Sequence, residues 1–125
     1  MNAKRIAVTG ATGFIGSHLT ERLLADTGAE VLALAASQKR LANLSGAVRD
    51  FEFAQCDMLH ADRCATLFNS FRPEVVYHLV AHPDGQESFD QIRRCVEVNL
   101  LGLVNAMEAA ANAGTRLFIF GDSTK

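Results

Sequence analysis

Residues 8–16 read Val-Thr-Gly-Ala-Thr-Gly-Phe-Ile-Gly, and this stretch decides the fold because it joins two kinds of secondary structure. Before its glycines, the run Arg5–Thr9 is apolar and rich in β-branched side chains, which predicts a buried strand. After them, Ile15, Leu19 and Leu23 recur every four residues, which predicts one face of a helix. The stretch is therefore predicted to be the turn between a first strand and a first helix.

The three glycines of this turn follow the pattern G-x-x-G-x-x-G. Gly10 permits a tight turn, Gly13 lets main chain approach a diphosphate without an intervening Cβ, and Gly16 lets the helix pack closely on the sheet. The free N–H groups and the positive dipole end of the helix would face the phosphates. The predicted contacts are Gly10, Thr12, Gly13, Phe14, Ile15 and Gly16. A glycine-rich turn without a ligand is the alternative.

Five short apolar runs are predicted as strands separated by helical segments. The runs are Arg5–Thr9, Glu30–Ala35, Phe51–Cys56, Val75–Val80 and Leu117–Phe120. Strands that alternate with helices need right-handed crossover connections, which give a parallel sheet with helices on both faces. We expect an α/β doubly wound parallel sheet of Rossmann type, with about five strands in the order 3-2-1-4-5. Since a full sheet of this type has about six strands, this sheet is expected to be incomplete.

The ends of the helices are predicted from stop signals. Gly28 is placed to end the first helix, and Pro73 closes a helix whose apolar stripe begins at Cys64. The longest helix should run from about Ser88 to Asn112, and the segment Gln38–Leu44 has the weakest helical pattern. The apolar side chains that share one face of the longest helix are Phe89, Ile92, Val96, Leu100, Leu103 and Met107.

Composition places the chain among single-domain globular proteins. It has 125 residues, of which 49% are apolar and 21% charged, and twelve Lys and Arg against fourteen Asp and Glu give a net charge of −2. These values exclude a disordered or fibrous chain, and the interspersed charges predict neither a nucleic-acid nor a membrane partner. We expect one domain over residues 1–125.

The cysteines and histidines predict neither a disulfide framework nor a metal centre. Cys56, Cys64 and Cys95 are odd in number and lack C-x-x-C spacing, so we expect reduced thiols and a cytoplasmic location. His78 and His82 are four residues apart but straddle a predicted strand end, so they lack the helical geometry of a zinc pair.

Residues 9–19, TGATGFIGSHL, resemble the glycine signature of the extended short-chain dehydrogenase/reductases, the NAD(P)-dependent epimerase/dehydratase group that acts largely on nucleotide sugars. Later stretches resemble family elements in the same order: residues 57–58, 78–81, 98–102 and 117–123. The resemblance covers nearly the whole chain. It implies an NAD(P)-binding Rossmann domain of an oxidoreductase that transfers hydride transiently to and from its coenzyme.

The resemblance also implies roles for single residues. Asp57 and Met58 would hold the adenine, and Asn99 would help to order the active site. Three residues would lie beside the cofactor: Leu79, Val80 and Ala81. Alternatives remain open, because Asp57 could instead cap the next helix, Asn99 could cap a kink, and His78 could be a core histidine.

The segment after the second strand favours NADP over NAD. An NAD site usually carries an acidic residue about 20 residues past the glycines, on the ribose 2′-hydroxyl. No acidic residue occurs between Glu30 and Asp50, whereas Ser37, Lys39 and Arg40 are available to a 2′-phosphate.

The catalytic residues that the resemblance implies are incomplete. Enzymes of this family use Tyr-x-x-x-Lys as general acid and base, with a Ser or Thr that hydrogen-bonds the substrate oxygen. Ser123 matches the hydroxyl position, with Thr124 as the alternative one residue further. The only tyrosine is Tyr77, and Ala81 stands four residues after it, so the chain is expected to be inactive alone.

Two hypotheses of function follow. The first is the cofactor-binding N-terminal portion of an epimerase/dehydratase-type oxidoreductase, truncated before its substrate domain, so that a small-molecule substrate binds only in a full-length context. The second is a stand-alone dinucleotide-binding module, a sensor or scaffold without catalysis. The first is favoured, because the chain ends within the stretch that resembles the catalytic segment. The uncovered strand 117–120 predicts exposed apolar surface and hence homo-oligomers.

Overall fold

The computed structural model describes residues 3–82 and 88–122 and shows a parallel sheet of five strands. The strands are β1 (Arg5–Thr9), β2 (Glu30–Ala35), β3 (Glu52–Gln55), β4 (Val75–His78) and β5 (Leu117–Phe120). Their order across the sheet is β3-β2-β1-β4-β5, and every neighbouring pair is parallel. The expected fold class and strand order are confirmed.

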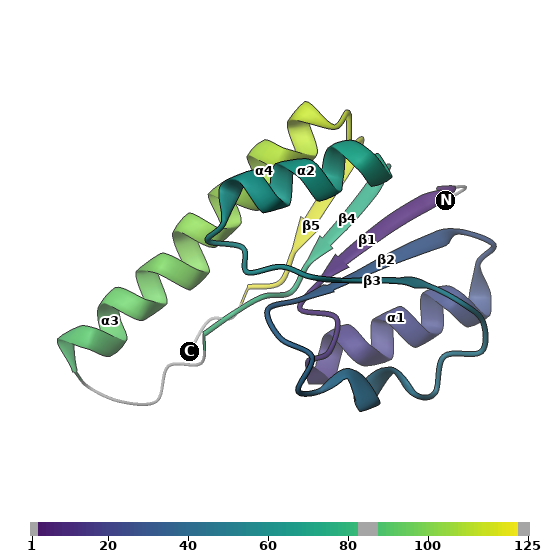
Figure 1. Cartoon of the computed structure of the whole chain (residues 1–125), viewed down its shortest axis with the longest axis horizontal. Helices are drawn as coiled ribbons and strands as arrows, with labels where there is room; N and C mark the ends of the chain where they lie inside the picture. The colour runs from purple at the N-terminus through teal and green to yellow at the C-terminus, as the bar shows by residue number, and fades with distance from the viewer. Residues whose placement is uncertain (1–2, 83–87, 123–125) are drawn as a thin grey trace.

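Helices cover both faces of the sheet (Figure 1). α1 (Phe14–Asp26) lies on one face, and α2 (Ala61–Phe71) packs beside α4 (Gly102–Asn112) on the other. α4 continues a helix that starts as α3 (Phe89–Cys95) and passes through a π-helical segment, η2 (Val96–Leu101). This long helix extends past the carboxyl ends of the strands, so only its α4 part lies over the sheet.

Two apolar cores lie on the two faces of the sheet. β1 and β2 are buried almost throughout, because their side chains alternate between the two cores. On the α1 face the core includes Ile6, Leu24 and Val31. On the other face it includes Leu32 and Phe68. Small buried residues let α4 lie close to the sheet: Gly102, Ala106, Ala109 and Ala110.

One expectation about α1 is confirmed and one was wrong. The helix ends at Asp26 with Thr27 as its C-cap, so Gly28 follows directly, where a stop glycine is expected. Thr27 is extended, and its N–H and hydroxyl both bond the carbonyl of Leu23, at 3.1 and 2.6 Å. Ile15 does not join the buried stripe and is 66% exposed, since the first turn of α1 stands at the carboxyl edge of the sheet. The buried face begins one residue later and consists of Gly16, Ser17, Thr20, Leu23 and Leu24.

The long helix has its predicted extent, but its predicted apolar face is not in the core. Apart from the partly buried Leu103, the side chains of that face are exposed: Phe89, Ile92, Val96, Leu100 and Met107. The weakly helical segment Gln38–Leu44 forms only a short 3-10 turn, η1 (Leu41–Leu44), in which Leu44 alone is buried.

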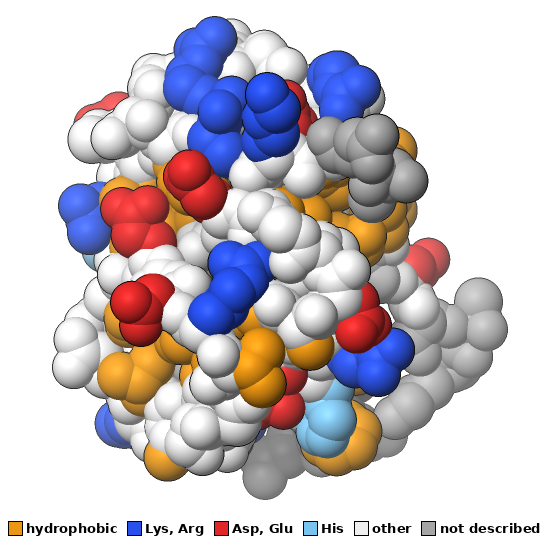
Figure 2. Space-filling model, turned by 90° about the vertical axis from the view of Figure 1, so that its right-hand side faces the viewer, with side chains coloured by type: hydrophobic (Ala, Val, Ile, Leu, Met, Phe, Trp, Pro, Cys, Tyr) orange, Lys and Arg blue, Asp and Glu red, His pale blue; other side chains and the backbone are white. Residues whose placement is uncertain are grey.

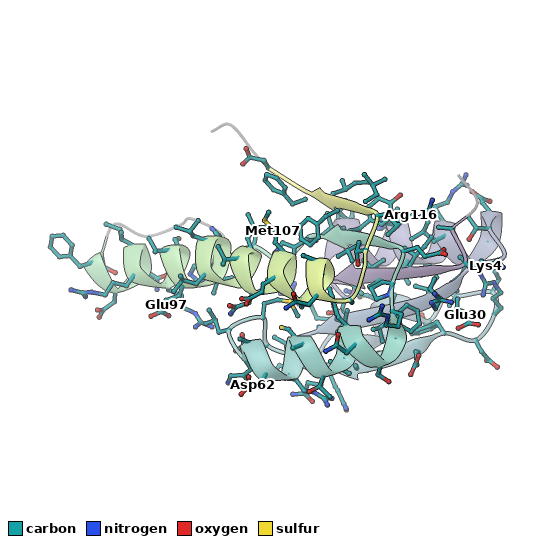
Figure 3. The ribbon with its side chains drawn as sticks, turned by 90° about the horizontal axis from the view of Figure 1, so that it is seen from above. Lys4, Glu30, Asp62, Glu97, Met107 and Arg116 are labelled. Atoms are coloured by element: carbon teal, nitrogen blue, oxygen red, sulfur yellow. The ribbon has the colours of Figure 1, made fainter. Side chains whose placement is uncertain are left out.

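Exposed apolar side chains extend over two elements, and we call them together the apolar flank. Its helical part is Phe89, Ile92, Val96, Leu100, Val104 and Met107, and its strand part is Leu117, Ile119 and Phe120. Met107 projects from the opposite side of the helix to Glu97, so the helix separates an apolar side from a charged one (Figure 3). The predicted exposure of residues 117–120 is confirmed, with Leu117 42% exposed.

The amino ends of the strands carry a mixed charged surface. Figure 2 looks onto this end of the molecule and shows Lys and Arg beside Asp and Glu. Arg5 Nε donates to the Arg72 carbonyl at 2.9 Å, and the main-chain N–H of Lys4 donates to Glu74. That N–H is the main reason that the pKa of the Glu74 carboxyl is lowered. Within residues 3–82 and 88–122, no helix has both the length and the apolar character needed to cross a bilayer.

Candidate functional site

The carboxyl ends of β1 and β4 meet where the strand order reverses, which is where open α/β sheets bind ligands. Gly10 follows β1 with φ of +65°, in the left-handed region that favours glycine. A Cβ on Gly10 would lie 2.8 Å from the carbonyl carbon of Leu79, the residue after β4. The Leu79 N–H donates to the Thr9 carbonyl at 3.2 Å. The glycine turn is therefore in direct contact with the main chain at the end of the neighbouring strand.

The first turn of α1 presents main-chain N–H groups at this edge. Gly13 is the N-cap and offers no side-chain acceptor, while its carbonyl accepts from the Ser17 N–H at 2.9 Å. The N–H groups of Phe14, Ile15 and Gly16 therefore have no acceptor within the helix. The side chains of Phe14 and Ile15 are turned to solvent. Free N–H groups at the positive end of the helix dipole suit an anion.

The carbonyl oxygen of Gly10 leaves little or no room for a side chain at the second and third glycines. A Cβ on Gly16 would lie 2.0 Å from that oxygen, which no real structure tolerates. A Cβ on Gly13 would lie 3.3 Å from it, a tight contact, and the Gly13 N–H donates to it at 3.1 Å. Thr12, between the first and second glycines, is buried. The turn thus has the compact, Cβ-free shape that a diphosphate requires, and the residues present fit that group.

The segment after β2 is held against the glycine turn. Asn43 in η1 donates from Nδ2 to the Thr12 carbonyl at 2.8 Å. Ser37 accepts from the Lys39 N–H at 3.4 Å, and Arg40 is exposed. A shallow hollow beside α1 is lined by Phe14, Ser17, His18, Glu21, Arg40 and Asn43. The structure therefore brings the predicted Arg40 to the side of the turn, while Ser37 bonds the Lys39 main chain within its own segment.

Asp57 shapes the turn that follows β3. Its Oδ1 accepts from the Leu59 N–H and its carbonyl accepts from the His60 N–H, both at 2.9 Å. The alternative that Asp57 caps α2 is wrong, because the N-cap is His60 and no side chain caps that helix. Met58 is only 3% exposed, and its side chain belongs to the core. Asn105 donates to the Met58 carbonyl at 2.8 Å.

His78 is a buried histidine at the end of β4. Its Nδ1 lies 2.8 Å from Thr9 Oγ1, and its ring stacks on Phe118 with centroids 5.9 Å apart. Burial lowers the pKa of the imidazole from 6.5 to about 4, so the ring is neutral at pH 7. Its Nε2 has no hydrogen-bond partner within the described part of the chain. These observations support a core histidine, as the alternative held.

Asn99 lies in η2 and holds the segment that follows β4. Its Oδ1 accepts from the His82 N–H at 2.7 Å, and its Nδ2 donates to the His82 carbonyl at 3.3 Å. The His82 ring contacts Gln91 through Nε2 and Oε1, 2.9 Å apart. Asn99 therefore has the polar task that its place in a helix indicated, and π-helical turns often mark functional positions. Val80 and Ala81, the predicted cofactor neighbours, directly precede His82, the residue that Asn99 holds.

The remaining predicted groups do not complete an acid–base centre in the described part of the chain. Ser123 lies outside the described residues, and Tyr77 packs against the core on the α1 face. Two amides that support the site, Asn43 and Asn105, were not predicted from the sequence. Their only signal is the one that singled out Asn99, an amide within a helical pattern where it is unfavourable.

A parallel sheet in the order 3-2-1-4-5, with a glycine turn where that order reverses, defines the class of Rossmann-type α/β domains. The model of the NAD dependent epimerase/dehydratase family matches residues 6–125, and the chain belongs to that family. The resemblance inferred from the glycine turn is confirmed.

Several similar proteins carry names that match this family. The UDP-glucose 4-epimerase of Mycolicibacterium smegmatis is 40% identical over 121 residues, 95% of this chain and 38% of that protein. A solved epimerase from Methanothermobacter thermautotrophicus has a TM-score of 0.84 at 33% identity, covering 98% of this chain and 36% of its own. The UDP-glucose 4-epimerase of Thermus thermophilus, solved with NAD, has a TM-score of 0.75 at 36% identity, covering 89% and 35%. The chain thus spans between 35% and 38% of the length of these proteins.

Proposed function

We propose that the chain binds NAD(P) at the carboxyl edge of its sheet and serves as the coenzyme-binding part of a nucleotide-sugar epimerase or dehydratase. The observation that carries the proposal is the glycine turn, in which Gly10 lies against the main chain of Leu79 while the first-turn N–H groups of α1 have no acceptor within the helix. Membership of the family and the names of the similar enzymes support it. When bound, the nicotinamide supplies the hydride acceptor and donor.

Each part of the edge has a proposed task. The N–H groups after Gly13 hold the diphosphate, because they carry the positive end of the α1 dipole. The carboxylate of Asp57 and the main chain of Met58 face the adenine. Val80 and Ala81 border the rest of the coenzyme. Asn99 holds this border in place, because its Oδ1 accepts from the His82 N–H and its Nδ2 donates to the His82 carbonyl.

A matched pair of glycine substitutions tests the proposal. Gly13→Ala places a Cβ in tight contact with the Gly10 carbonyl, and we expect coenzyme affinity to fall about tenfold or more with a small change in Tm. Gly28→Ala meets no atom within 4 Å and serves as the control. Calorimetric titration with NADH and NADPH gives both affinities. If the unsubstituted chain binds neither coenzyme at millimolar concentration, the proposal is wrong.

We also propose that NADPH binds more tightly than NADH. The support is the absence of acidic residues between Glu30 and Asp50 and the position of Arg40 beside the glycine turn. Arg40→Ala should weaken NADPH several-fold more than NADH, because only NADPH carries the 2′-phosphate. Tighter binding of NADH by the unsubstituted chain contradicts this preference.

For catalysis, we propose that the 125-residue chain alone is inactive. Its only tyrosine belongs to β4 and has no lysine four residues after it. Incubation with NAD and UDP-glucose, followed by chromatography of the sugar nucleotides, should show no conversion. The three free cysteines support our placing the chain in the reducing cytoplasm.

We further propose that the chain self-associates through the apolar flank. Phe89 is 78% exposed and Phe120 51%, and clusters of such side chains commonly mark interaction surfaces. β5 is also an outer strand of the sheet, and an apolar outer strand readily pairs with another chain.

A further inference from the structure

Two buried thiols touch at the end of β3. Cys56 follows the strand and Cys64 lies in the first turns of α2, eight residues later, with their Sγ atoms 3.6 Å apart. Cys56 is 3% exposed and Cys64 is fully buried. Both are free thiols, and so is Cys95, which is only partly buried on α3. The pair has no task in the proposed coenzyme site.

The two cysteines flank the turn that Asp57 shapes, one before it and one after it in the sequence. Cys64 Sγ lies 3.8 Å from the Met58 carbonyl and 3.9 Å from Met58 Sδ, so its S–H has weak acceptors on the turn itself. The hydrogen bond from Cys64 is the main cause that lowers the pKa of the Cys56 thiol, and the charge of Arg63 adds to it, against burial and Asp57. The same hydrogen bond raises the pKa of Cys64. Cys56 is therefore the sulfur that ionises first.

We propose that Cys56 and Cys64 form a disulfide when a peroxide oxidises Cys56, and that this bridge weakens coenzyme binding at the adjoining Asp57 turn. The formation of the bridge is independent of any ligand. Its effect on the coenzyme rests on the proposed function.

The reaction balances with hydrogen peroxide as the oxidant. The Cys56 thiolate attacks one peroxide oxygen, the O–O bond breaks, and Cys56 becomes a sulfenic acid while the other oxygen leaves as hydroxide and takes up a proton. Cys64 sulfur then attacks the Cys56 sulfur, the S–O bond breaks, and water leaves with the proton of the Cys64 thiol. Two thiols lose two electrons, and one peroxide becomes two waters.

The geometry favours this partner over others. Closing the gap from 3.6 Å to a disulfide bond of about 2.05 Å brings the two sulfurs about 1.5 Å closer together. Cys56 follows the outer strand β3 and is 3% exposed, so a small oxidant reaches it through a local opening of this edge of the sheet. The bridge draws the Cys64 sulfur, now 3.8 Å from the Met58 carbonyl, toward Cys56 and ties α2 to the strand end, so we expect the turn that positions the Asp57 carboxylate to shift.

The wild-type chain tests the bridge directly. The chain is treated with hydrogen peroxide, remaining thiols are alkylated, and the peptides are identified by mass spectrometry. We expect a peptide pair that joins Cys56 to Cys64, restored to two alkylated thiols by dithiothreitol. If Cys56 and Cys64 are both recovered as alkylated thiols while Cys95 is oxidised, the proposal is overturned. The same holds if Cys56 pairs with a second chain.

Two variants separate the steps. Cys95→Ser leaves the pair intact and should give the same bridge. Cys64→Ser removes the resolving sulfur but keeps a hydrogen-bond donor for Cys56, so Cys56 should stay as a sulfenic acid that dimedone traps. In wild-type chain the bridge should weaken coenzyme binding roughly threefold to tenfold, reversibly. A bridge with unchanged coenzyme affinity overturns the regulatory part. Absent binding by the reduced chain instead refutes the proposed function, and the mass spectra still decide on the bridge.

Discussion

The two halves of the sheet are built from similar apolar strands but are covered very differently. In the half formed by β1, α1 and β2, nearly every strand residue is buried between the two helical layers. In the half formed by β4, the long helix and β5, the four apolar residues of β5 remain partly or largely exposed. The difference teaches that the glycine-turn half finds its packing partners within this chain, whereas the β5 half presents apolar surface outward.

The largest effect is expected in the closely packed half. Gly16→Ala would place a Cβ 2.0 Å from the Gly10 carbonyl oxygen, and since both atoms belong to main chain, the turn or α1 must move. We expect unfolding free energy to fall by about 4 kcal/mol. Urea unfolding followed by circular dichroism measures it.

Gly28→Ala is the matched control in the same half. Its Cβ meets nothing within 4 Å and its φ lies outside the left-handed region, so stability should change by less than about 1 kcal/mol, with stabilisation favoured. A large loss at Gly28, or a negligible one at Gly16, would show that close packing does not distinguish this half.

The next effect concerns His78, which ends β4 in the second half and contacts Thr9 of the first. Its pKa falls from 6.5 to about 4 on folding because the ring is buried, so between these values the unfolded chain binds a proton that the folded chain does not. Stability should therefore drop as pH falls from 6.5 to 4, by up to about 3 kcal/mol. His78→Leu should flatten this part of the stability curve. Urea unfolding at closely spaced pH values checks both, and an unchanged slope in the variant would assign the loss to other groups.

Sequence patterns predicted the sheet well because each strand of this fold is a short apolar run. The bounds of Arg5–Thr9, Glu30–Ala35 and Leu117–Phe120 agree with the structure, whereas the predicted runs at Phe51–Cys56 and Val75–Val80 extend past the ends of β3 and β4. Leu79 and Val80 leave the sheet against the glycine turn, whereas Phe51 and Cys56 pack onto the two cores. A pattern of apolar residues cannot show where the last ladder hydrogen bond falls.

The helices were harder to predict, because a helical period shows that a face is apolar but not which element covers it. The face of Val96 and Leu100 has the spacing of a buried stripe, yet α4 packs through its alanines instead. Within the site, the glycine turn was predictable because each glycine has a steric reason. The core position of the Met58 side chain and the role of Asn43 were not, because both depend on contacts far along the chain.

A smaller effect is expected for self-association through the apolar flank. Val104→Glu adds a charge at a side chain that is 48% exposed, without disturbing the core. We expect the dissociation constant of the oligomer to rise about tenfold, or ~1.4 kcal/mol. Glu108→Gln, at another exposed position of α4, is the control. Sedimentation velocity over a concentration series measures both, and a wild-type chain that stays monomeric at high micromolar concentration would contradict the proposal.

The smallest effect tests whether the β5 half nevertheless contains one well-fixed part. Asn99→Ala removes both hydrogen bonds to the main chain of His82, so amide exchange at His82 should accelerate by about five- to tenfold, equivalent to the loss of ~1 kcal/mol of local protection. Gln91→Ala removes only the contact to the His82 ring and should leave that amide protected. Hydrogen exchange followed by NMR resolves the single N–H. If Gln91→Ala has the larger effect, the ring rather than the amide pair fixes this segment, and Asn99 loses its proposed task at the coenzyme border.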